Sequence, residues 1–210
     1  MQSTNARYQE LLASTHRMQT QLYIDNVVYG EEKIMEGSLQ TKNSLFQGDI
    51  PTVGGAVAGE ISVQLLGVLS SSVARMAELR PQVRLVGDSG EPSEWVAQGV
   101  YNVDKRSYNK QTGVLTLHGY DKMLATEQWY TGSVGTGGVT DITIVNRVCT
   151  QVGITLDSET DSFFSASGKK YKVTKPRNYT CRELLQAIAG WYGGNWCMTP
   201  VGKLRLVLLN

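Results

Sequence analysis

The chain has 210 residues, of which 41% are apolar and 19% are charged, and this is the composition of a folded protein with a sizeable core. Twenty Lys and Arg against nineteen Asp and Glu leave a net charge of +1, so no overall field attracts nucleic acid or an acidic membrane. Three cysteines and two histidines argue against zinc fingers, haem attachment and a disulfide framework, and no apolar run reaches the ~18 residues of a membrane-spanning helix.

The first residues predict a short amphipathic helix. Within residues 4–17, Tyr8, Leu11, Leu12 and Thr15 recur at the spacing of one helix face. The same segment lacks the continuous apolar core of a secretion signal. We therefore expect residues 1–19 to form an N-terminal helix that packs on a neighbouring element.

The residues that follow show the period of β-strands. Ile61, Val63 and Leu65 fall on one face of a strand, and turn-forming residues separate the runs. The expected strands are Thr20–Tyr29, Lys33–Lys42, Val57–Leu66, Gln82–Val86, Glu94–Asp104 and Thr112–Tyr120. Antiparallel strands this regularly spaced must cover their edges, so we expect a small closed β-barrel or sandwich over residues 20–130.

The period changes after Asp121. Residues 121–128 predict a short helix, and residues 131–139 hold four glycines in nine positions, which is typical of a flexible linker. We expect residues 140–210 to form a small α/β domain that is incomplete. The predicted fold class is thus α+β, with a mostly antiparallel β-barrel followed by this α/β domain.

Two helices stand out in the second part. Apolar residues at helical spacing predict a helix over Asp141–Val152, with Thr140 as its N-cap and Gly153 as its stop. Thr180 and Glu183 match a capping box, so a second helix begins there and ends at the Gly-Gly pair that follows. The remaining expectations are strands at 153–157, 171–175, 195–199 and 204–209 and a loop at 158–168.

Cysteine catalysis is the first chemical possibility to weigh. No two of Cys149, Cys181 and Cys197 have C-x-x-C spacing, and each is interpreted as a small apolar side chain of the core. A catalytic thiolate would need His16 or His118 as its base, and nothing in the sequence joins either histidine to a cysteine.

The glycines of residues 132–138 invite a phosphate-loop interpretation. A P-loop continues directly into Lys and Ser or Thr, whereas Val139, Thr140 and Asp141 follow here, and the carboxylate of Asp141 would repel phosphate. The order of these glycines also differs from a dinucleotide fingerprint. We therefore favour a linker.

Carboxylate clusters give no clear site either. Glu31 and Glu32 lie in a predicted turn, while Asp157, Glu159 and Asp161 alternate faintly in the manner of a calcium loop. The glycine and the distal Glu of an EF-hand are missing, so a solvated loop is favoured. We expect no catalytic, cofactor-binding or metal-binding residues.

A basic run and several aromatic residues leave alternatives open. The cations Lys169, Lys170, Lys172, Lys175 and Arg177 follow one another without an acid, with Tyr171 and Tyr179 between and after them. The run fits either a surface for single-stranded nucleic acid or the exposed face of a strand, and the low net charge favours the strand. The aromatics Trp95, Trp191, Tyr192 and Trp196 fit either a sugar site or core packing, and the helical position of Tyr192 favours the core.

Residues 94–128 resemble a recurring passage of bacteriophage tail hub proteins, in which a W…G.Y.VD strand leads to an L.L.GYDKM strand and a short helix. The matching residues here are Trp95, Gly99, Tyr101, Val103, Asp104, Leu115, Leu117, Gly119, Tyr120, Asp121, Lys122 and Met123. The strands at 37–49 and 59–67, the Gly153-Ile154 join, the helix 180–189 and the hairpin 194–206 resemble the family too. The likeness spans residues 20–210, and its motifs are structural rather than catalytic.

The resemblance implies a virion structural protein of a phage or prophage tail, made in the bacterial cytoplasm. In that family a baseplate hub trimer carries two tail-tube-like barrels per subunit, and its ring matches the hexameric tail tube. Residues 20–130 would be the first barrel. No second barrel and no peptidoglycan-cleaving domain precede the end of the chain at Asn210. We therefore expect a fragment or a short member, monomeric when isolated.

The resulting expectation is a non-enzymatic protein that joins the tail tube to the distal tip and helps to form the conduit for DNA. Its partners would be the tube, distal tail and tip proteins, with no specific nucleic-acid recognition and no membrane span. The physical means would be side-by-side packing of barrels with paired edge strands.

The first alternative is a carbohydrate-binding module for cell walls, which would use Trp95, Trp191 or Trp196 in an exposed groove. The second is an enzyme, a peptidoglycan hydrolase, or the non-catalytic part of such a tail-associated hydrolase.

Overall fold

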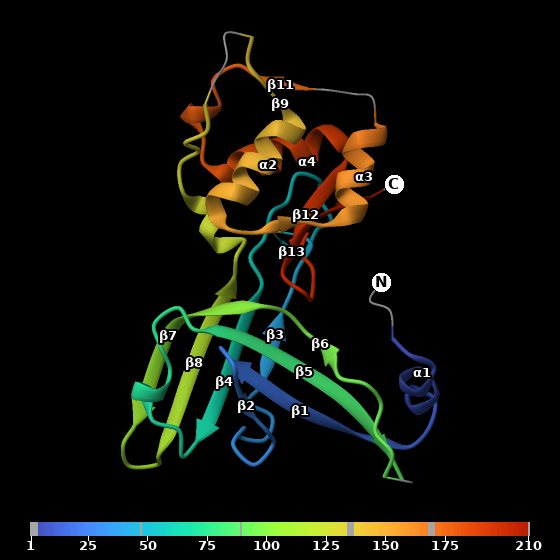
Figure 1. The fold of residues 1–210 in the computed structure, drawn as a ribbon, viewed down its shortest axis with the longest axis vertical. Helices are drawn as coiled ribbons and strands as arrows, with labels where there is room; N and C mark the ends of the chain where they lie inside the picture. The colour runs from blue at the N-terminus through green and yellow to red at the C-terminus, as the bar shows by residue number, and fades with distance from the viewer. Residues whose placement is uncertain (1–3, 47, 89, 134–136, 168–170, 210) are drawn as a thin grey trace. The chain divides into compact units, whose positions relative to one another are not determined.

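The computed structural model describes residues 4–46, 48–88, 90–133, 137–167 and 171–209, and they form two compact units (Figure 1). The sheet unit consists of Met1–Lys42 and Glu60–Tyr120, and the helical unit consists of Asn43–Gly59 and Asp121–Asn210. Each unit has its own cluster of buried apolar side chains. The units are not consecutive blocks of sequence, because residues 43–59 leave the sheet unit between two of its strands and fold with the helical unit.

The sheet unit is built on one mostly antiparallel sheet whose strands follow the order β2-β1-β5-β7-β8-β4-β3, with β6 on β5. Its elements are the helix α1 (Ala6–Leu12), the strands β1 (His16–Ile24), β2 (Val27–Tyr29), β3 (Gln40–Lys42), β4 (Glu60–Leu66), β5 (Glu78–Gly87), β6 (Val96–Ala97), β7 (Tyr101–Asn109) and β8 (Val114–Asp121), and the 3₁₀ helix η1 (Ser70–Ser72). Side chains such as Val63, Leu79 and Leu117 are fully buried on its inner face.

The helix expected over residues 1–19 is wrong in its second half. Asn5 caps α1 by accepting the Tyr8 N–H at 2.8 Å, but the helix ends at Leu12 and β1 begins at His16. The single strand expected at 20–29 is instead the β1–β2 hairpin, in which Ile24 pairs with Val27. Asp25 begins the two-residue turn with a φ of 51°, a left-handed conformation that hairpin turns of this length require.

The sheet is open, so the expected closed barrel is not confirmed. The order of strands runs from β2 to β3 without returning to its start. β3 has only three residues, and β2 covers only the last third of β1, Leu22–Ile24. The strand expected at 33–42 is also reduced to β3, since most of residues 30–39 form turns and a single bridge from Ile34 to Leu65.

The helical unit packs helices around a small sheet in which β13 lies between β10 and β12. Its helices are η2 (Leu124–Glu127), α2 (Asp141–Val152), α3 (Ser158–Ala166), η3 (Pro176–Asn178) and α4 (Cys181–Tyr192), and its strands are β9 (Val139–Thr140), β10 (Thr155–Leu156), β11 (Lys172–Val173), β12 (Gly194–Met198) and β13 (Lys203–Leu208). None of the described helices combines the length and the apolarity that crossing a membrane requires.

The two strongest helix predictions are confirmed. α2 spans the expected residues and ends at Gly153 in the left-handed conformation. α4 begins with a complete capping box, because the Thr180 hydroxyl accepts the Glu183 N–H at 3.1 Å and the Glu183 carboxylate accepts the Thr180 N–H at 2.7 Å. The expected hairpin at 195–209 is present as β12 and β13.

The loop expected at 158–168 is wrong, because residues Ser158–Ala166 form α3. Asp157 caps this helix by accepting the Glu159 N–H, and two acids in the first turn suit the helix dipole. Phe164 is buried and stacks on Trp196 at 6.2 Å, which gives the helix its apolar contact. The linker expected at 131–139 includes residues 134–136, which lie outside the described residues, and it stays a prediction.

Candidate functional site

The cysteines and histidines do not form a nucleophilic site. Cys149 and Cys181 are buried in the helical unit, where burial raises the pKa of each thiol to about 11, and Cys197 is half-buried. His16 and His118 belong to the sheet unit, on β1 and β8. His118 instead approaches Glu60 at 3.8 Å. A protonated thiol is a poor nucleophile, so these cysteines are core side chains.

The acidic residues expected in a solvated loop form a structural network. Asp157 receives two hydrogen bonds of 3.1 Å from Arg205 on β13, and Glu159 lies 3.5 Å from the same guanidinium. Burial opposes the charge on Asp157, but the hydrogen bond and charge of Arg205 outweigh it and hold the pKa of the carboxyl below its usual value. Among the described residues, no group of three or more His, Cys, Asp or Glu is arranged to hold a metal ion.

The basic run does not form one described surface. Lys169 and Lys170 lie outside the described residues, and Lys172 lies on β11. Arg177 is exposed, and its guanidinium donates to the Gly132 carbonyl at 3.1 Å. Tyr171 packs on Trp191 with ring centroids 5.0 Å apart. The exposed-strand interpretation therefore accounts for the described part of the run better than a stacking platform does.

The tryptophans proposed for sugar binding are engaged elsewhere. Trp196 is fully buried, and its indole N–H donates to the Leu185 carbonyl at 2.7 Å. Trp95 is half-buried under the guanidinium of Arg84, which lies 4.4 Å from its ring. Sequence analysis did not single out Trp129, whose side chain is 63% exposed.

In the motif at 95–123, two glycines lie where neighbouring atoms leave no room for a side chain. Gly119 on β8 faces the backbone of β7, and a Cβ there would lie 2.5 Å from the Asn102 carbonyl oxygen. Gly99 lies against the ring of Tyr101, which is itself buried. These glycines allow two chain segments to approach more closely than any side chain would permit.

Asp121, in this motif, is the last residue of β8 and the described carboxyl with the largest pKa shift. It is 6% exposed and accepts the Gly59 N–H at 2.8 Å and the Met123 N–H at 2.9 Å. Burial raises the pKa of Asp121 to about 6, against the opposing effects of these hydrogen bonds and of the Arg182 charge. Because each oxygen holds one backbone group, Asp121 joins residue 59 to the start of η2.

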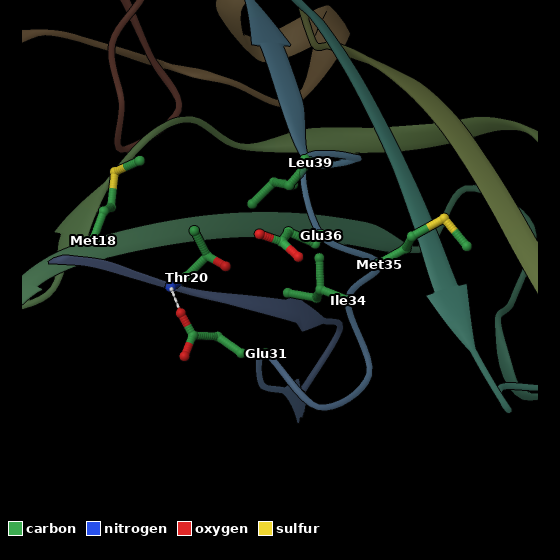
Figure 2. Close-up of a pocket in the computed structure, with 8 residues that line it drawn as sticks. Met18, Thr20, Glu31, Ile34, Met35, Glu36 and Leu39 are labelled. Atoms are coloured by element: carbon green, nitrogen blue, oxygen red, sulfur yellow. Dashed lines mark hydrogen bonds between the residues drawn. The ribbon is translucent and has the colours of Figure 1, made fainter.

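The sheet unit carries a hollow beside its open edge, here called the β1 hollow (Figure 2). Its volume is about 510 Å³, and it is lined by Met18, Thr20, Glu31, Ile34, Met35, Glu36, Gly37 and Leu39. Figure 2 shows the side chains of Thr20, Ile34, Glu36 and Leu39 gathered between β1 and the 31–39 segment, while Met35 points away. Met18 is 59% exposed, so apolar surface of the inner sheet face is uncovered here.

Glu31 occupies the edge of β1 that lacks a strand. Its carboxylate accepts the Thr20 N–H at 3.3 Å, where a neighbouring strand would place a carbonyl, and lies 3.4 Å from Arg17 (Figure 2). A side chain thus satisfies a backbone donor at an otherwise open sheet edge, which is one way in which proteins protect such edges. The Thr20 donor at this edge is thus satisfied within the chain.

A second hollow, here called the β7 hollow, lies at the start of β5. It has a volume of about 570 Å³ and is lined by Arg75, Met76, Val103, Asp104, Lys105 and Arg106. Met76 is 66% exposed and has a φ of 59°, a conformation that residues other than glycine rarely adopt. Among the residues that line the two hollows, no base, nucleophile and oxyanion donor come together.

No family model matches the chain, and no curated protein sequence matches it either. Its fold is similar to that of the 43 kDa tail protein of prophage MuSo2 from Shewanella oneidensis, with a TM-score of 0.55 and 13% identity over 90% of this chain. It is also similar to a tail protein from Neisseria meningitidis MC58 (TM-score 0.51, 11% identity) and to a chain of the Francisella PdpA-VgrG complex (0.51, 8%), each over 90% of this chain. The chain covers 54%, 50% and 31% of these three proteins.

Proposed function

We propose that this chain is a structural subunit of a phage or prophage tail, located at the hub where the tail tube meets the distal tip. In this role its sheet unit is the first barrel of each subunit in a trimeric ring and packs side by side with the second barrels, and the ring helps to form the conduit for DNA. Tube, distal tail and tip proteins are its partners. No chemistry is required of it.

One observation carries this proposal: the fold likeness to tail proteins extends over 90% of the chain and therefore includes both units. A likeness limited to one small sheet would be shared by many unrelated proteins. The chain spans about half the length of these two tail proteins, so the second barrel of the ring is supplied by residues beyond this chain or by another protein.

The surfaces of the sheet unit also support an assembly role. An open sheet exposes unpaired edges, and here β2 and β3 are the end strands, while β2 pairs only with Leu22–Ile24 of β1. Apolar side chains remain exposed beside them, including Met18, Val27 and Val28. Neighbouring barrels of the ring would cover these edges.

The experiment is to delete the gene in the phage or prophage that encodes the chain and to examine particles by electron microscopy. Loss of the hub should leave tails without a tip or block tail assembly, and a tagged copy should label one end of the tail. Normal tails in the deletion strain, or purified tails without the chain by mass spectrometry, would overturn the proposal.

A further inference from the structure

An exposed tryptophan stands on the helical unit beside the start of α4. The side chain of Trp129 is 63% exposed, more than that of any other described tryptophan. Among the described residues, no aromatic ring packs against it and no cation lies over its face. An indole ring in this state leaves a large, flat apolar surface in water, which a bound group would cover.

The backbone around Trp129 is held in place from two sides. The side-chain amide of Gln151 on α2 donates to the Trp129 carbonyl at 2.8 Å and accepts the Thr131 N–H at 3.0 Å. On the other side, the Tyr130 N–H donates to the Tyr179 carbonyl at 3.1 Å. The exposed indole is therefore attached to a fixed support.

A short antiparallel pairing sets the direction of the Trp129 side chain. Trp129 lies opposite Thr180, and the pair is flanked by the bond from Tyr130 to Tyr179 and by the bond from the Cys181 N–H to the Gln128 carbonyl at 2.9 Å. Residues between two such bonds form a non-hydrogen-bonded pair, whose side chains lie close together on one face. The Tyr179 side chain belongs to the opposite face.

Thr180 also lines a third hollow, here called the α4 hollow. It has a volume of about 350 Å³ and is lined by residues 56–58, Glu127, Thr180, Arg182, Glu183 and Gln186, all of which belong to the helical unit. This volume lies within the range of about 300–1,000 Å³ that is common for ligand sites. Because Trp129 is the neighbour of Thr180 in the pairing, its ring stands at the rim of this hollow.

The side chains of the α4 hollow supply both donors and acceptors. The Arg182 guanidinium is fixed by the Met123 carbonyl at 2.8 Å and the Glu127 carboxylate at 2.6 Å. Glu183 uses one carboxylate oxygen to accept the N–H and the hydroxyl of Thr180. Among the described residues, no group donates to its second oxygen and none bonds the half-buried amide of Gln186.

The two signs of charge in the α4 hollow restrict the class of ligand. An anion such as phosphate would face Glu127 and Glu183, and a cation would face Arg182. A hydroxyl group both donates and accepts hydrogen bonds, so an uncharged polyol can satisfy all of these groups. Sugar rings with equatorial hydroxyls also present a flat face of C–H groups, which matches an indole ring.

We propose that Trp129 and the α4 hollow form a binding site for an uncharged, β-linked saccharide of the glucose configuration. One sugar ring stacks on Trp129, and the next places its hydroxyls against Arg182, Glu183 and Gln186. The tryptophans that the sequence singled out take no part in it. This binding activity goes beyond the structural role proposed above and does not depend on it.

Calorimetric titration of the full chain with cellotetraose and with chitotetraose tests this site. Both probes have the flat ring face and differ in the group at C2, and we expect millimolar or tighter binding of at least one. Trp129→Ala should weaken the affinity about tenfold, because the stacking surface is lost. Gln186→Leu keeps most of the side-chain volume but removes its donors and acceptor, so it should weaken the affinity about fivefold.

Two matched controls make the result specific. Tyr179→Ala removes a 45% exposed aromatic ring from the opposite face of the same pairing, and Gln111→Leu removes an exposed amide from the sheet unit. Both should leave the affinity unchanged. Urea unfolding of Trp129→Ala and Gln186→Leu shows that each variant is folded before its affinity is compared.

The absence of binding heat with both tetrasaccharides would overturn the site, as would equal effects of Trp129→Ala and Tyr179→Ala. Oxidation by N-bromosuccinimide distinguishes a protein occupant from a saccharide. Protection of Trp129 in purified tails, without protection by either tetrasaccharide in the purified chain, would assign Trp129 to a protein contact and overturn the saccharide site. The titrations need no assembled tail, so they stand or fail separately from the gene deletion that tests the structural role.

Discussion

At the scale of single residues, two aspartates show how the hydrogen-bond donors around a buried carboxyl determine whether its pKa is raised or lowered. Asp121 and Asp157 are each 6% exposed, yet the pKa of Asp121 is raised and that of Asp157 is lowered. Asp157 has a bidentate guanidinium, whereas Asp121 has two backbone N–H groups, which do not compensate for the loss of water around a charge.

The effect of Asp121→Asn on the free energy of unfolding should change with pH. The folded chain binds the Asp121 proton more tightly than the unfolded chain, so this group contributes stability below pH 4 that is lost as the pH rises through about 6. A shift of about two units corresponds to about 3 kcal/mol. Asparagine does not titrate, so the stability of Asp121→Asn relative to the wild type should improve by up to about 3 kcal/mol between pH 4 and pH 7.

Urea unfolding at a series of pH values measures this difference, with Asp161→Asn as the control at an exposed carboxyl. Asparagine has one acceptor oxygen for two backbone donors, so Asp121→Asn should be the less stable protein at pH 4. A difference between Asp121→Asn and wild type that stays constant from pH 4 to pH 7 would contradict the raised pKa.

Gly119→Ala tests the close approach of β7 and β8. A Cβ at this position would lie 2.5 Å from a backbone oxygen, which cannot move aside without displacing the strand, so we expect a loss of about 2–3 kcal/mol. Gly190→Ala is the matched control, because that glycine is helical and has no atom within 4 Å of the added Cβ. It should stabilise by about 0.5–1 kcal/mol in thermal or urea unfolding. Equal effects of the two substitutions would show that the close approach is not a constraint.

At the scale of elements, local signals succeeded where both ends of an element were marked. α4 has a capping box and a terminal glycine, and α2 has Thr140 at its N-cap position and a terminal glycine, so their bounds could be predicted. α3 was missed because its polar residues hide two apolar contacts, and the cap signal of Asp157 was interpreted as a solvated loop. The open edge of the sheet could not be predicted, since the alternation of a strand shows which face is buried and not which strand is its neighbour.

Asp157→Ala tests the new helix. It removes the cap of α3 and leaves Arg205 on β13 without its bidentate partner, so we expect a loss of about 2 kcal/mol at pH 7. Because the pKa of Asp157 is lowered by folding, its stabilising effect is present above the ordinary pKa and is lost as the pH falls below about 4.

Glu159→Ala is the control for this prediction, since its side chain is 76% exposed and exposed ion pairs contribute at most about 1 kcal/mol. Urea unfolding of both variants at pH 7 and pH 3 measures the effects. A loss for Asp157→Ala that is as large at pH 3 as at pH 7 would exclude the ionised carboxylate as its cause.

At the scale of the whole molecule, the two units share one chain in an interrupted way. The sequence indicated two parts but not that residues 43–59, between β3 and β4, belong to the second. These residues are held by groups that lie 140 positions away: the buried Asn195 side chain bonds Gly55 N and Thr52 O, and Trp196 N donates to Gly55 O. No local pattern predicts pairing at this separation, because the partners are defined only once β12 has formed.

This arrangement predicts that the segment matters more to the helical unit than to the sheet unit. Lys42 and Glu60 are partners in the β3–β4 pair, so a two-residue Asn-Gly turn can replace residues 43–59 without changing their register. The replacement uncovers Trp196 and leaves the Asn195 amide without both bonds. Each unsatisfied buried polar group costs about 1–3 kcal/mol, and the lost burial of Ala56 adds to this.

The helical unit should therefore lose at least about 3 kcal/mol of unfolding free energy, and its transition should move to a lower urea concentration. A red shift of Trp196 emission in a Trp95→Phe, Trp129→Phe and Trp191→Phe background reports this transition. Hydrogen exchange at β4 and β8, which pair from Glu60 to Leu66, should stay slow, because that pairing lies wholly in the sheet unit. Equal loss of protection in both sets of strands would show that residues 43–59 stabilise the chain as a whole and that the two cores do not unfold separately.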